Sequence, residues 1–292
     1  MEKDKFLTQL EKVAWILVIY TLLVIVWGAW VRISHSGDGC GETWPLCRGV
    51  LFPQAVQKKT WIEYAHRAMS GAYGLIVIGI FLACWRKKDK FPWLVKPATY
   101  TLVFMITEAL LGAKLVLFGL TGSNATFYRA FVMGLHQINS LLLVGSATWL
   151  ALAVAKPELR LEHFRKILIP AVIMFLIAST GAWAALASTL FPSDSLLRGF
   201  MQDLSGDSNV LLRLRIIHPL IAASLGTYLA VKFWQVQAMR LSFFIVFAIL
   251  FGMLTLGFLS PVWMKLTHLL IAHTLWIFLV SYGANSFDSV KR

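Results

Sequence analysis

The sequence predicts an all-α membrane protein with eight transmembrane helices, arranged as two pseudo-symmetric four-helix bundles. Of the 292 residues, 58% are hydrophobic and only 14% are charged. A helix needs about 20 mostly apolar residues to cross roughly 30 Å of hydrocarbon, where every backbone polar group must be satisfied within the segment. Eight stretches meet this requirement, at 13–31, 62–85, 97–118, 128–155, 167–189, 212–234, 241–260 and 264–284.

An internal repeat divides the chain into the two expected domains, 1–156 and 157–292. The first apolar stretch ends in W-G-A-W-V, and the fifth contains T-G-A-W-A. Histidines recur on the even-numbered spans of both halves. Because each half has an even number of spans, both start from the same side of the membrane, which predicts a parallel repeat about an axis along the membrane normal.

The net charge of +13 is best explained by membrane topology. The basic residues lie between the spans and show no soluble face suited to nucleic acid. Most of them fall on the side of the N-terminus, so the positive-inside rule places both termini in the cytoplasm or its topological equivalent. Loops 32–61 and 190–211 then face outward. The acidic opening 1–12 does not resemble a cleaved signal peptide, so the first helix is expected to stay in the mature protein.

Two of the three cysteines lie in the first outer loop, which is rich in Gly and Pro. An oxidising compartment favours a disulfide between Cys40 and Cys47. Zinc binding is the alternative, but this pair with only His35 nearby lacks the usual four-ligand pattern. Cys84, at the inner end of the second span, is interpreted as a small buried hydrophobe.

Four histidines lie within two or three turns of the outer ends of the even-numbered spans, and therefore at one membrane level. Two imidazoles on neighbouring helices at equal depth are what bis-histidine haem ligation requires. The expected pairs are His66 with His136 and His218 with His268. The alternative is a structural or proton-relay role, since histidines also serve these purposes inside membranes.

The other three histidines are weaker candidates. His35 and His163 lie in loops, where water solvates them. His273 follows His268 by five residues, about 140° around the helix, so both are not expected to face one iron.

Glu63 lies three residues before His66, on the same helix face. Ionisable groups inside a membrane segment are costly and mark functional sites. Glu108, in mid-span, is expected to pair with Lys114 or to face the first haem cavity. Five arginines expected near the outer interface could clamp haem propionates or extend to the interface. They are Arg32, Arg67, Arg129, Arg213 and Arg215.

These residues resemble the haem A synthase family of integral membrane enzymes over nearly the full chain. The loop Gly37–Cys47, G-D-G-C-G-E-T-W-P-L-C, resembles the family's paired-cysteine loop, and E-Y-A-H-R at 63–67 resembles its glutamate and first-ligand motif. The other three histidines fall at the matching ligand positions. The resemblance implies a bacterial membrane enzyme that oxidises a methyl group of haem O to the formyl group of haem A in successive two-electron steps. Haem O synthase and an electron acceptor are the implied partners.

The resemblance also implies separate roles for the two sites. His218 and His268 would hold a resident haem b, and His66 and His136 would hold the substrate, haem O. An iron held by two histidines has no open position, so oxygen activation at the substrate haem would require one ligand to leave. Otherwise electrons leave through the second haem, and His218 and His268 are expected to relay them; the sequence names neither the oxidant nor the electron acceptor. Glu63 would act as a general base or hold the attacking water. The alternative for Glu63 is to hold His66 or Arg67 by hydrogen bonds.

Two features depart from the family pattern. Loop 190–211 lacks the second cysteine pair that many bacterial members carry. Pro219 follows His218 where arginine is common, so the helix is expected to lose the hydrogen bond to the Arg215 carbonyl and to kink.

Two other functions fit parts of the pattern. A non-enzymatic dihaem b-type cytochrome that takes electrons from quinol would need the four histidines but not Glu63 or the cysteine loop. A transporter would use eight spans in two repeats, but the broken helices expected at its binding site are not evident.

Overall fold

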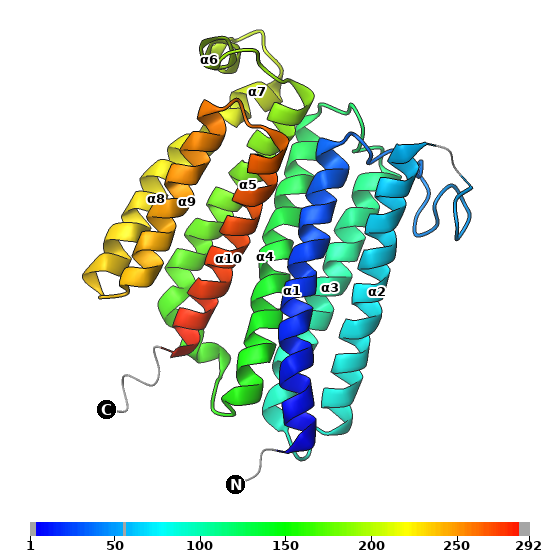
Figure 1. Cartoon of the computed structure of the whole chain (residues 1–292), viewed down its shortest axis with the longest axis vertical. Coiled ribbons are helices and arrows are strands. Elements are labelled where there is room, and N and C mark those ends of the chain that lie inside the picture. Colours follow the sequence, from blue (N-terminus) through cyan, green and yellow to red (C-terminus); the bar gives the residue numbers. More distant parts are fainter. Residues whose placement is uncertain (1–3, 55–56, 286–292) are drawn as a thin grey trace.

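The computed structural model describes residues 4–54 and 57–285, which form a bundle of long helices (Figure 1). The predicted location of both termini falls partly on residues 1–3 and 286–292, outside this range. The long helices are α1 (Lys5–Ile33), α2 (Lys58–Arg86), α3 (Pro92–Leu117), α4 (Phe127–Ala155), α5 (Leu168–Leu190), α8 (Ile217–Gln235), α9 (Met239–Gly257) and α10 (Val262–Asn285).

Within the described residues, eight helical segments are long and apolar enough to cross a membrane, which confirms the predicted all-α class and number of spans. The chain is an integral membrane protein. Helix α1 begins and α10 ends at one end of the bundle, and the loop before α2 and the helices α6 and α7 lie at the other (Figure 1).

Several boundaries differ from the expectation, and α1, for example, begins at Lys5 and not at residue 13. The sixth span is two helices, α7 (Val210–Arg215) and α8, interrupted at Ile216. This break agrees with the expected disturbance near Pro219, because proline cannot donate the hydrogen bond that would continue the helix. The second outer loop contains a helix, α6 (Leu196–Leu204), and a 3-10 helix, η1 (Leu161–Ile167), precedes α5. Short amphipathic segments of this kind carry too weak a hydropathy signal to be recognised as spans.

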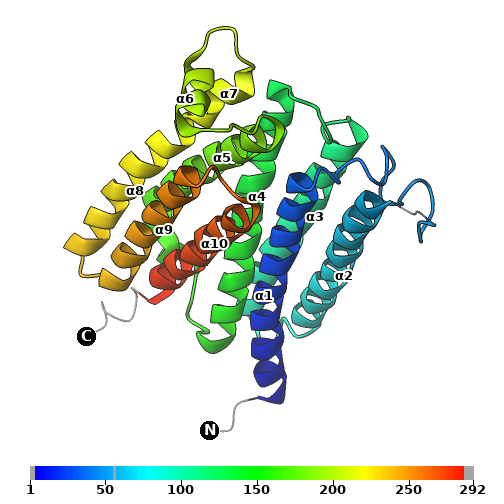
Figure 2. The ribbon, with the colours of Figure 1, turned by 45° about the horizontal axis from the view of Figure 1, so that its top comes forward.

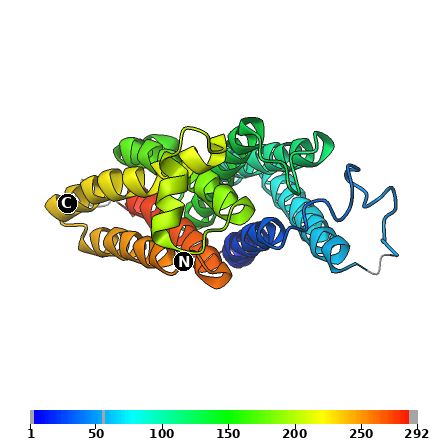
Figure 3. The same cartoon turned by 90° about the horizontal axis from the view of Figure 1, so that it is seen from above.

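The long helices pack as two groups of four, side by side in the view from above (Figure 3). In the first group, α1 and α3 each contact both α2 and α4, so α2 and α4 face each other across the diagonal. In the second group, α5 and α9 each contact both α8 and α10, so α8 and α10 are the diagonal pair. Histidine-bearing helices therefore oppose each other in both groups.

Helix α4 joins the two groups, since it packs on α5 and α10 as well as on α1 and α3 (Figure 2). In its most apolar stretch 78% of the residues are buried, far more than in any other span. Two tryptophans of the second group reach it. Trp183 of α5 donates to the Ala130 carbonyl (2.9 Å), and Trp276 of α10 donates to the Leu141 carbonyl (2.6 Å).

Each of these indoles packs against a glycine of α4 that lies one helical turn after the carbonyl it bonds. A Cβ at Gly134 would lie 2.9 Å from Nε1 of Trp183, and a Cβ at Gly145 would lie 3.0 Å from Nε1 of Trp276. The absence of a side chain lets the indole approach the backbone and reach the carbonyl. The two glycines therefore set the distance between the groups.

We predict that Gly145→Leu destabilises the protein by about 1–3 kcal/mol, because a side chain there overpacks the contact with Trp276. Gly79→Leu is the control, since a Cβ at this position of α2 meets no atom within 4 Å. The measurement is thermal unfolding of both variants in one detergent. Equal unfolding temperatures would contradict this account of the interface.

Candidate functional site

The four candidate histidines come from the diagonally opposed helices, with His66 on α2, His136 on α4, His218 on α8 and His268 on α10. All four are partly buried. His66 and His136 lie within electrostatic range of each other, and the rings of His218 and His268 have centroids 6.4 Å apart at 67°. The structure thus brings together the residues of each expected pair.

Every one of these imidazoles lies against a glycine of a neighbouring helix. The pairs are Gly28 with His66, Gly112 with His136, Gly181 with His218 and Gly252 with His268. These glycines belong to α1, α3, α5 and α9, the other diagonals of the two groups. The sequence indicated only part of this pattern, through the repeated G-A-W that contains Gly28 and Gly181.

The contacts are close enough to exclude a methyl group at three positions. A Cβ at Gly28 or Gly252 would lie 2.9 Å from the Cε1 atom of its histidine, and one at Gly181 would lie 3.1 Å away. At Gly112 the same distance is 4.0 Å, an ordinary contact. The lack of a side chain at these glycines lets each ring lie close to the backbone of the neighbouring helix.

The ring separation of the second pair matches that of two axial ligands of a haem iron. Two metal–nitrogen bonds of about 2 Å, together with the radii of the two rings, give a centroid separation of about 6 Å. The 6.4 Å between His218 and His268 agrees with this value. No group of three or more His, Cys, Asp or Glu side chains able to hold a metal ion occurs in the described part of the chain. Two imidazoles at the separation of His218 and His268 fit an axially ligated haem.

Glu63 lies at the outer end of this region and is 3% exposed. Its Oε2 accepts from the Cys40 backbone N–H (2.8 Å), and its Oε1 accepts from Nη2 (2.6 Å) and Nε (3.2 Å) of Arg67. Arg67 also donates to the carbonyls of Thr43 and Leu46 at 2.6 and 2.7 Å. The carboxylate thus holds the first outer loop against α2. This agrees with the alternative role for Glu63, in which it holds Arg67 by hydrogen bonds.

The predicted disulfide between Cys40 and Cys47 is present, and both cysteines are buried. The zinc alternative is therefore excluded. Cys84 is a buried free cysteine, as expected of a small hydrophobe. Because the Glu63 hydrogen bond is to the Cys40 N–H, the disulfide-closed turn and the carboxylate stabilise one loop conformation.

Glu108 of α3 faces His136, and the alternative pairing with Lys114 is wrong. Its Oε2 lies 3.4 Å from Nδ1 of His136 and accepts from Nδ2 of Asn139 at 2.7 Å, while its Oε1 accepts from Ser140 Oγ. Lys114 instead places its ammonium over the rings of Phe118 and Tyr128, a cation–π contact that satisfies it near the interface.

Three of the five arginines hold loops. Besides Arg67, Nη1 of Arg129 donates to the carbonyls of 122 and 124 at 2.8 and 2.7 Å, and Arg215 pairs with Asp203 at 2.8 Å. Arg213 is exposed. Arg32 is partly buried, with its Nε lacking a hydrogen-bond partner in the described residues, and lies within electrostatic range of Arg129 and Lys265. Nε of Arg129 also lacks a hydrogen-bond partner in the described residues, so Arg32 and Arg129 both have a buried donor free.

His273, a weak candidate in the sequence, is 1% exposed and lies between the two groups. Its Nε2 is 3.4 Å from Nε2 of Gln137 on α4, and its Nδ1 is 2.9 Å from the Leu269 carbonyl. It does not face the iron position of His268, as the helix geometry predicted. His163, the loop candidate, accepts from the Arg160 N–H at Nδ1 (2.9 Å).

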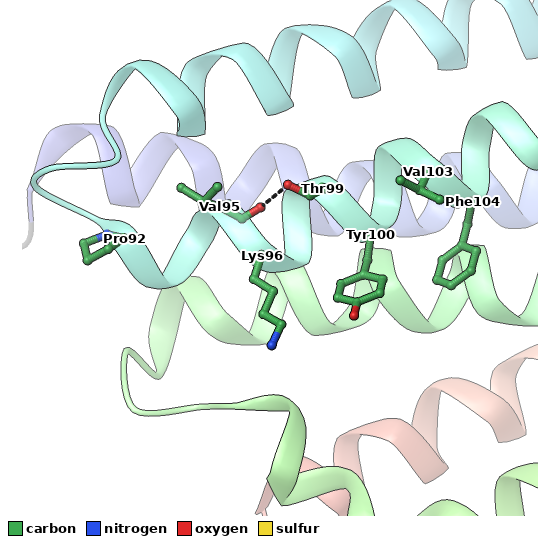
Figure 4. A pocket seen from close by; sticks show the side chains of 7 residues that line it. All are labelled: Pro92, Val95, Lys96, Thr99, Tyr100, Val103 and Phe104. Carbon is green, nitrogen blue, oxygen red and sulfur yellow. Dashed lines mark hydrogen bonds between the residues drawn. The ribbon is translucent and has the colours of Figure 1, made fainter.

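A surface groove along the inner half of α3 carries no chemistry of this kind (Figure 4). Its one ionisable amine is Lys96, and Thr99 donates to the Val95 carbonyl within its own helix at 2.8 Å. The lining residues are Pro92, Val95, Lys96, Thr99, Tyr100, Val103 and Phe104. The histidine pairs, not this groove, form the candidate site.

We predict that Glu63→Ala loosens the first outer loop, because hydrogen bonds to a charged group stabilise by about 1.5–3 kcal/mol each. Trypsin cleavage after the exposed Arg48 should become at least about tenfold faster in the detergent-solubilised protein. The control is Glu42→Ala, which removes an exposed carboxylate of the same loop. Equal cleavage rates in the two variants would contradict the fastening role of Glu63.

Comparison with known proteins places the chain in a family. A family model described as cytochrome oxidase assembly protein matches residues 11–280. A protoheme IX farnesyltransferase of Thermus thermophilus is 33% identical, over 96% of this chain and 49% of that protein. A heme A synthase of Shouchella clausii is 30% identical, over 80% of this chain and 78% of that protein. One of Bacillus licheniformis is 36% identical over 49% of this chain and 44% of its own length.

The chain spans about half the length of several of the curated relatives it matches, including the Thermus thermophilus protein. The family match covers nearly all of the eight spans, the cysteine loop and the four histidines. The chain therefore belongs to the haem A synthase family of cytochrome oxidase assembly proteins.

Proposed function

We propose that this protein is a haem A synthase, an oxidoreductase that converts the methyl group of haem O to the formyl group of haem A within the membrane. The observation that carries the proposal is the buried carboxylate Glu63, held by Cys40 and Arg67 one helical turn from His66. A dihaem cytochrome needs ligands but has no use for a fixed carboxylate at the rim of one site.

The two halves, 1–156 and 157–292, have different roles in this proposal. His66 and His136 bind the substrate, haem O. His218 and His268 hold a resident haem b, which supplies one-electron redox chemistry when bound. The close glycine contacts of His66, His218 and His268 and the 6.4 Å separation of the second pair support the two sites.

The residues of the first half provide the acid–base chemistry. Conversion of a methyl to a formyl group takes oxygen from one water and releases four protons and four electrons, in two two-electron steps. Oε1 of Glu63 accepts two hydrogen bonds from Arg67, whereas Oε2 accepts one from the Cys40 N–H, and a carboxylate oxygen has two acceptor sites. Oε2 of Glu63 can therefore take a substrate proton or hold the water while Arg67 keeps the carboxylate in place.

The second half lacks an equivalent base, which supports the assignment of the substrate to the first half. With His66 aligned to His218, the position of Glu63 corresponds to Arg215, and Arg215 pairs with Asp203 in the loop. An arginine cannot act as a general base, since its pKa is too high for it to lose its proton in proteins. The same fold thus carries one reactive and one non-reactive site.

Buried cations near the outer ends of α1 and α10 suit the carboxylates of a porphyrin. Arg32 is near Arg129 and Lys265. Like charges brought together away from water need an anion between them, and a guanidinium binds a carboxylate with two parallel hydrogen bonds. Arg32, between the two halves, is the residue we assign to a propionate.

A haem O synthase is the proposed supplier of substrate. The Thermus thermophilus relative named protoheme IX farnesyltransferase is a longer protein, and about half of its length is similar to nearly all of this chain. A membrane electron acceptor is the second proposed partner, because four electrons must leave the protein.

We further propose that both termini lie in the cytoplasm of a bacterial cell, with the cysteine loop on the outer side. A disulfide persists in an oxidising compartment, and the basic inner loops obey the positive-inside rule.

We predict that cells producing this protein together with a haem O synthase contain haem A, and that Glu63→Gln lowers haem A at least about 10²-fold while haem O accumulates. The factor is that expected for loss of general-base catalysis. Chromatographic separation of extracted haems measures both. Glu42→Gln is the control and should leave the ratio unchanged. Haem B alone in the native protein, despite available haem O, would contradict the synthase function and favour the dihaem cytochrome.

A further inference from the structure

A polar cluster surrounds Nδ1 of His136 in the middle of the first group of helices. Glu108 of α3 places Oε2 3.4 Å from this nitrogen. Asn139 and Ser140, one turn after His136 on α4, donate to the two carboxylate oxygens, and Asn139 also donates to the Phe104 carbonyl at 2.8 Å. The carboxylate is therefore fixed by two donors on the same helix as the histidine.

The second group has the same backbone arrangement without this cluster. Aligning Gly112 with Gly252 and His136 with His268 places Ala248 at the position of Glu108. The same alignment places Ile271 and Ala272 at the positions of Asn139 and Ser140. All three polar residues are thus replaced by apolar ones, so the cluster is not needed to hold a histidine against a glycine in this fold.

The other three candidate ligands have no carboxylate at Nδ1. Nδ1 of His218 lies 3.4 Å from Thr180 Oγ1, whose hydroxyl is also within 3.0 Å of two carbonyls of its own helix. Nδ1 of His66, His136 and His268 is buried without a partner in hydrogen-bonding geometry in the described residues, and of these three only Nδ1 of His136 has a carboxylate oxygen beside it, at 3.4 Å. His136 alone among the four has an anionic neighbour at this nitrogen.

We propose that Glu108 is a positioning residue that accepts a hydrogen bond from Nδ1–H of His136, directs Nε2 toward the iron of the substrate site and makes this nitrogen a stronger donor than its counterpart on His268. The proposal rests on the proposed function, in that it takes His136 and His268 as haem ligands. A carboxylate at the outer nitrogen of a ligating histidine fixes its tautomer and raises its basicity.

The difference between His136 and His268 predicts which of the two sites has the lower reduction potential. A more basic axial ligand stabilises the ferric over the ferrous state and lowers the reduction potential, and hydrogen bonding around the ligand is one of the means by which a protein sets this potential. Glu108 therefore holds the first site at a lower potential than the second. Electrons released at the substrate then move downhill toward the His218–His268 pair.

The test uses haem B as the probe, bound to the purified full-length protein in detergent, and measures the potential of each site by a spectroscopic redox titration. Glu108→Gln keeps the side-chain size and removes the negative charge, and Glu108→Ala introduces the residue found at 248. The component of the redox titration that disappears in His136→Ala belongs to the first site. Glu42→Gln controls for the loss of an exposed negative charge.

We expect Glu108→Gln to move the first component to a more positive potential, by about 59 mV for a tenfold change in the ferric-to-ferrous ratio of a one-electron couple. The second component should stay in place. We also expect about tenfold weaker retention of haem in the first site. Glu108→Ala should bring the two potentials closer together.

The proposal is overturned if neither component moves, or if both move equally. It is also overturned if the variant lowers the unfolding temperature while the haem that remains keeps its potential, since Glu108 would then serve only packing. Haem B is not the substrate, so the potentials are read without any turnover. A native protein that binds no haem would overturn both this proposal and the proposed function.

Discussion

Four imidazoles inside the helix bundle, three of them in close contact with a glycine of a neighbouring helix, are the constraint on which the rest of the structure depends. An imidazole on one helix of a four-helix group occupies the centre of the group unless a neighbouring helix has no side chain at the same level. Gly28, Gly181 and Gly252 have no side chain, and a Cβ at these positions would lie 2.9–3.1 Å from the Cε1 atom of the neighbouring imidazole. The glycines therefore decide where the rings lie, and the rings decide where a flat group can lie.

The same requirement explains how the two groups are joined. Helix α4 carries His136 toward one group and two further glycines toward the other. Trp183 and Trp276 cross it at these glycines and donate to its carbonyls, so the two bundles are held at a fixed distance by specific hydrogen bonds. In a bilayer, where lipid tails are as apolar as leucine, such close backbone contacts and hydrogen bonds are what hold helices together.

Against this shared framework, the chemistry differs between the halves. The first half carries Glu63 and Glu108 beside its histidines, where the second has Arg215 and Ala248. Both carboxylates are fixed by donors from the protein, and neither is exposed. In our proposal, the two bundles provide two haem sites, and these polar residues confine proton chemistry to the first.

Much of this could be predicted from the sequence, because hydropathy and the spacing of histidines are local signals. The eight spans followed from hydropathy, the Cys40–Cys47 disulfide from two cysteines in one loop, and the family from the cysteine-loop and glutamate–histidine motifs. The partner of Glu108 did not, since the sequence offers Lys114 six residues away on the same helix, whereas His136 reaches it only through packing of α3 on α4. The packing role of the four glycines was missed for the same reason, because the histidine that lies against each glycine is on another helix.

The most direct test of the account is the number of haems per chain in the purified protein, with histidine variants to assign the ligands. Two low-spin haems are expected, one lost in His66→Ala or His136→Ala and the other lost in His218→Ala or His268→Ala. A single haem that disappears in both His66→Ala and His268→Ala would show that the ligands come from different halves. That result would contradict the division into two sites.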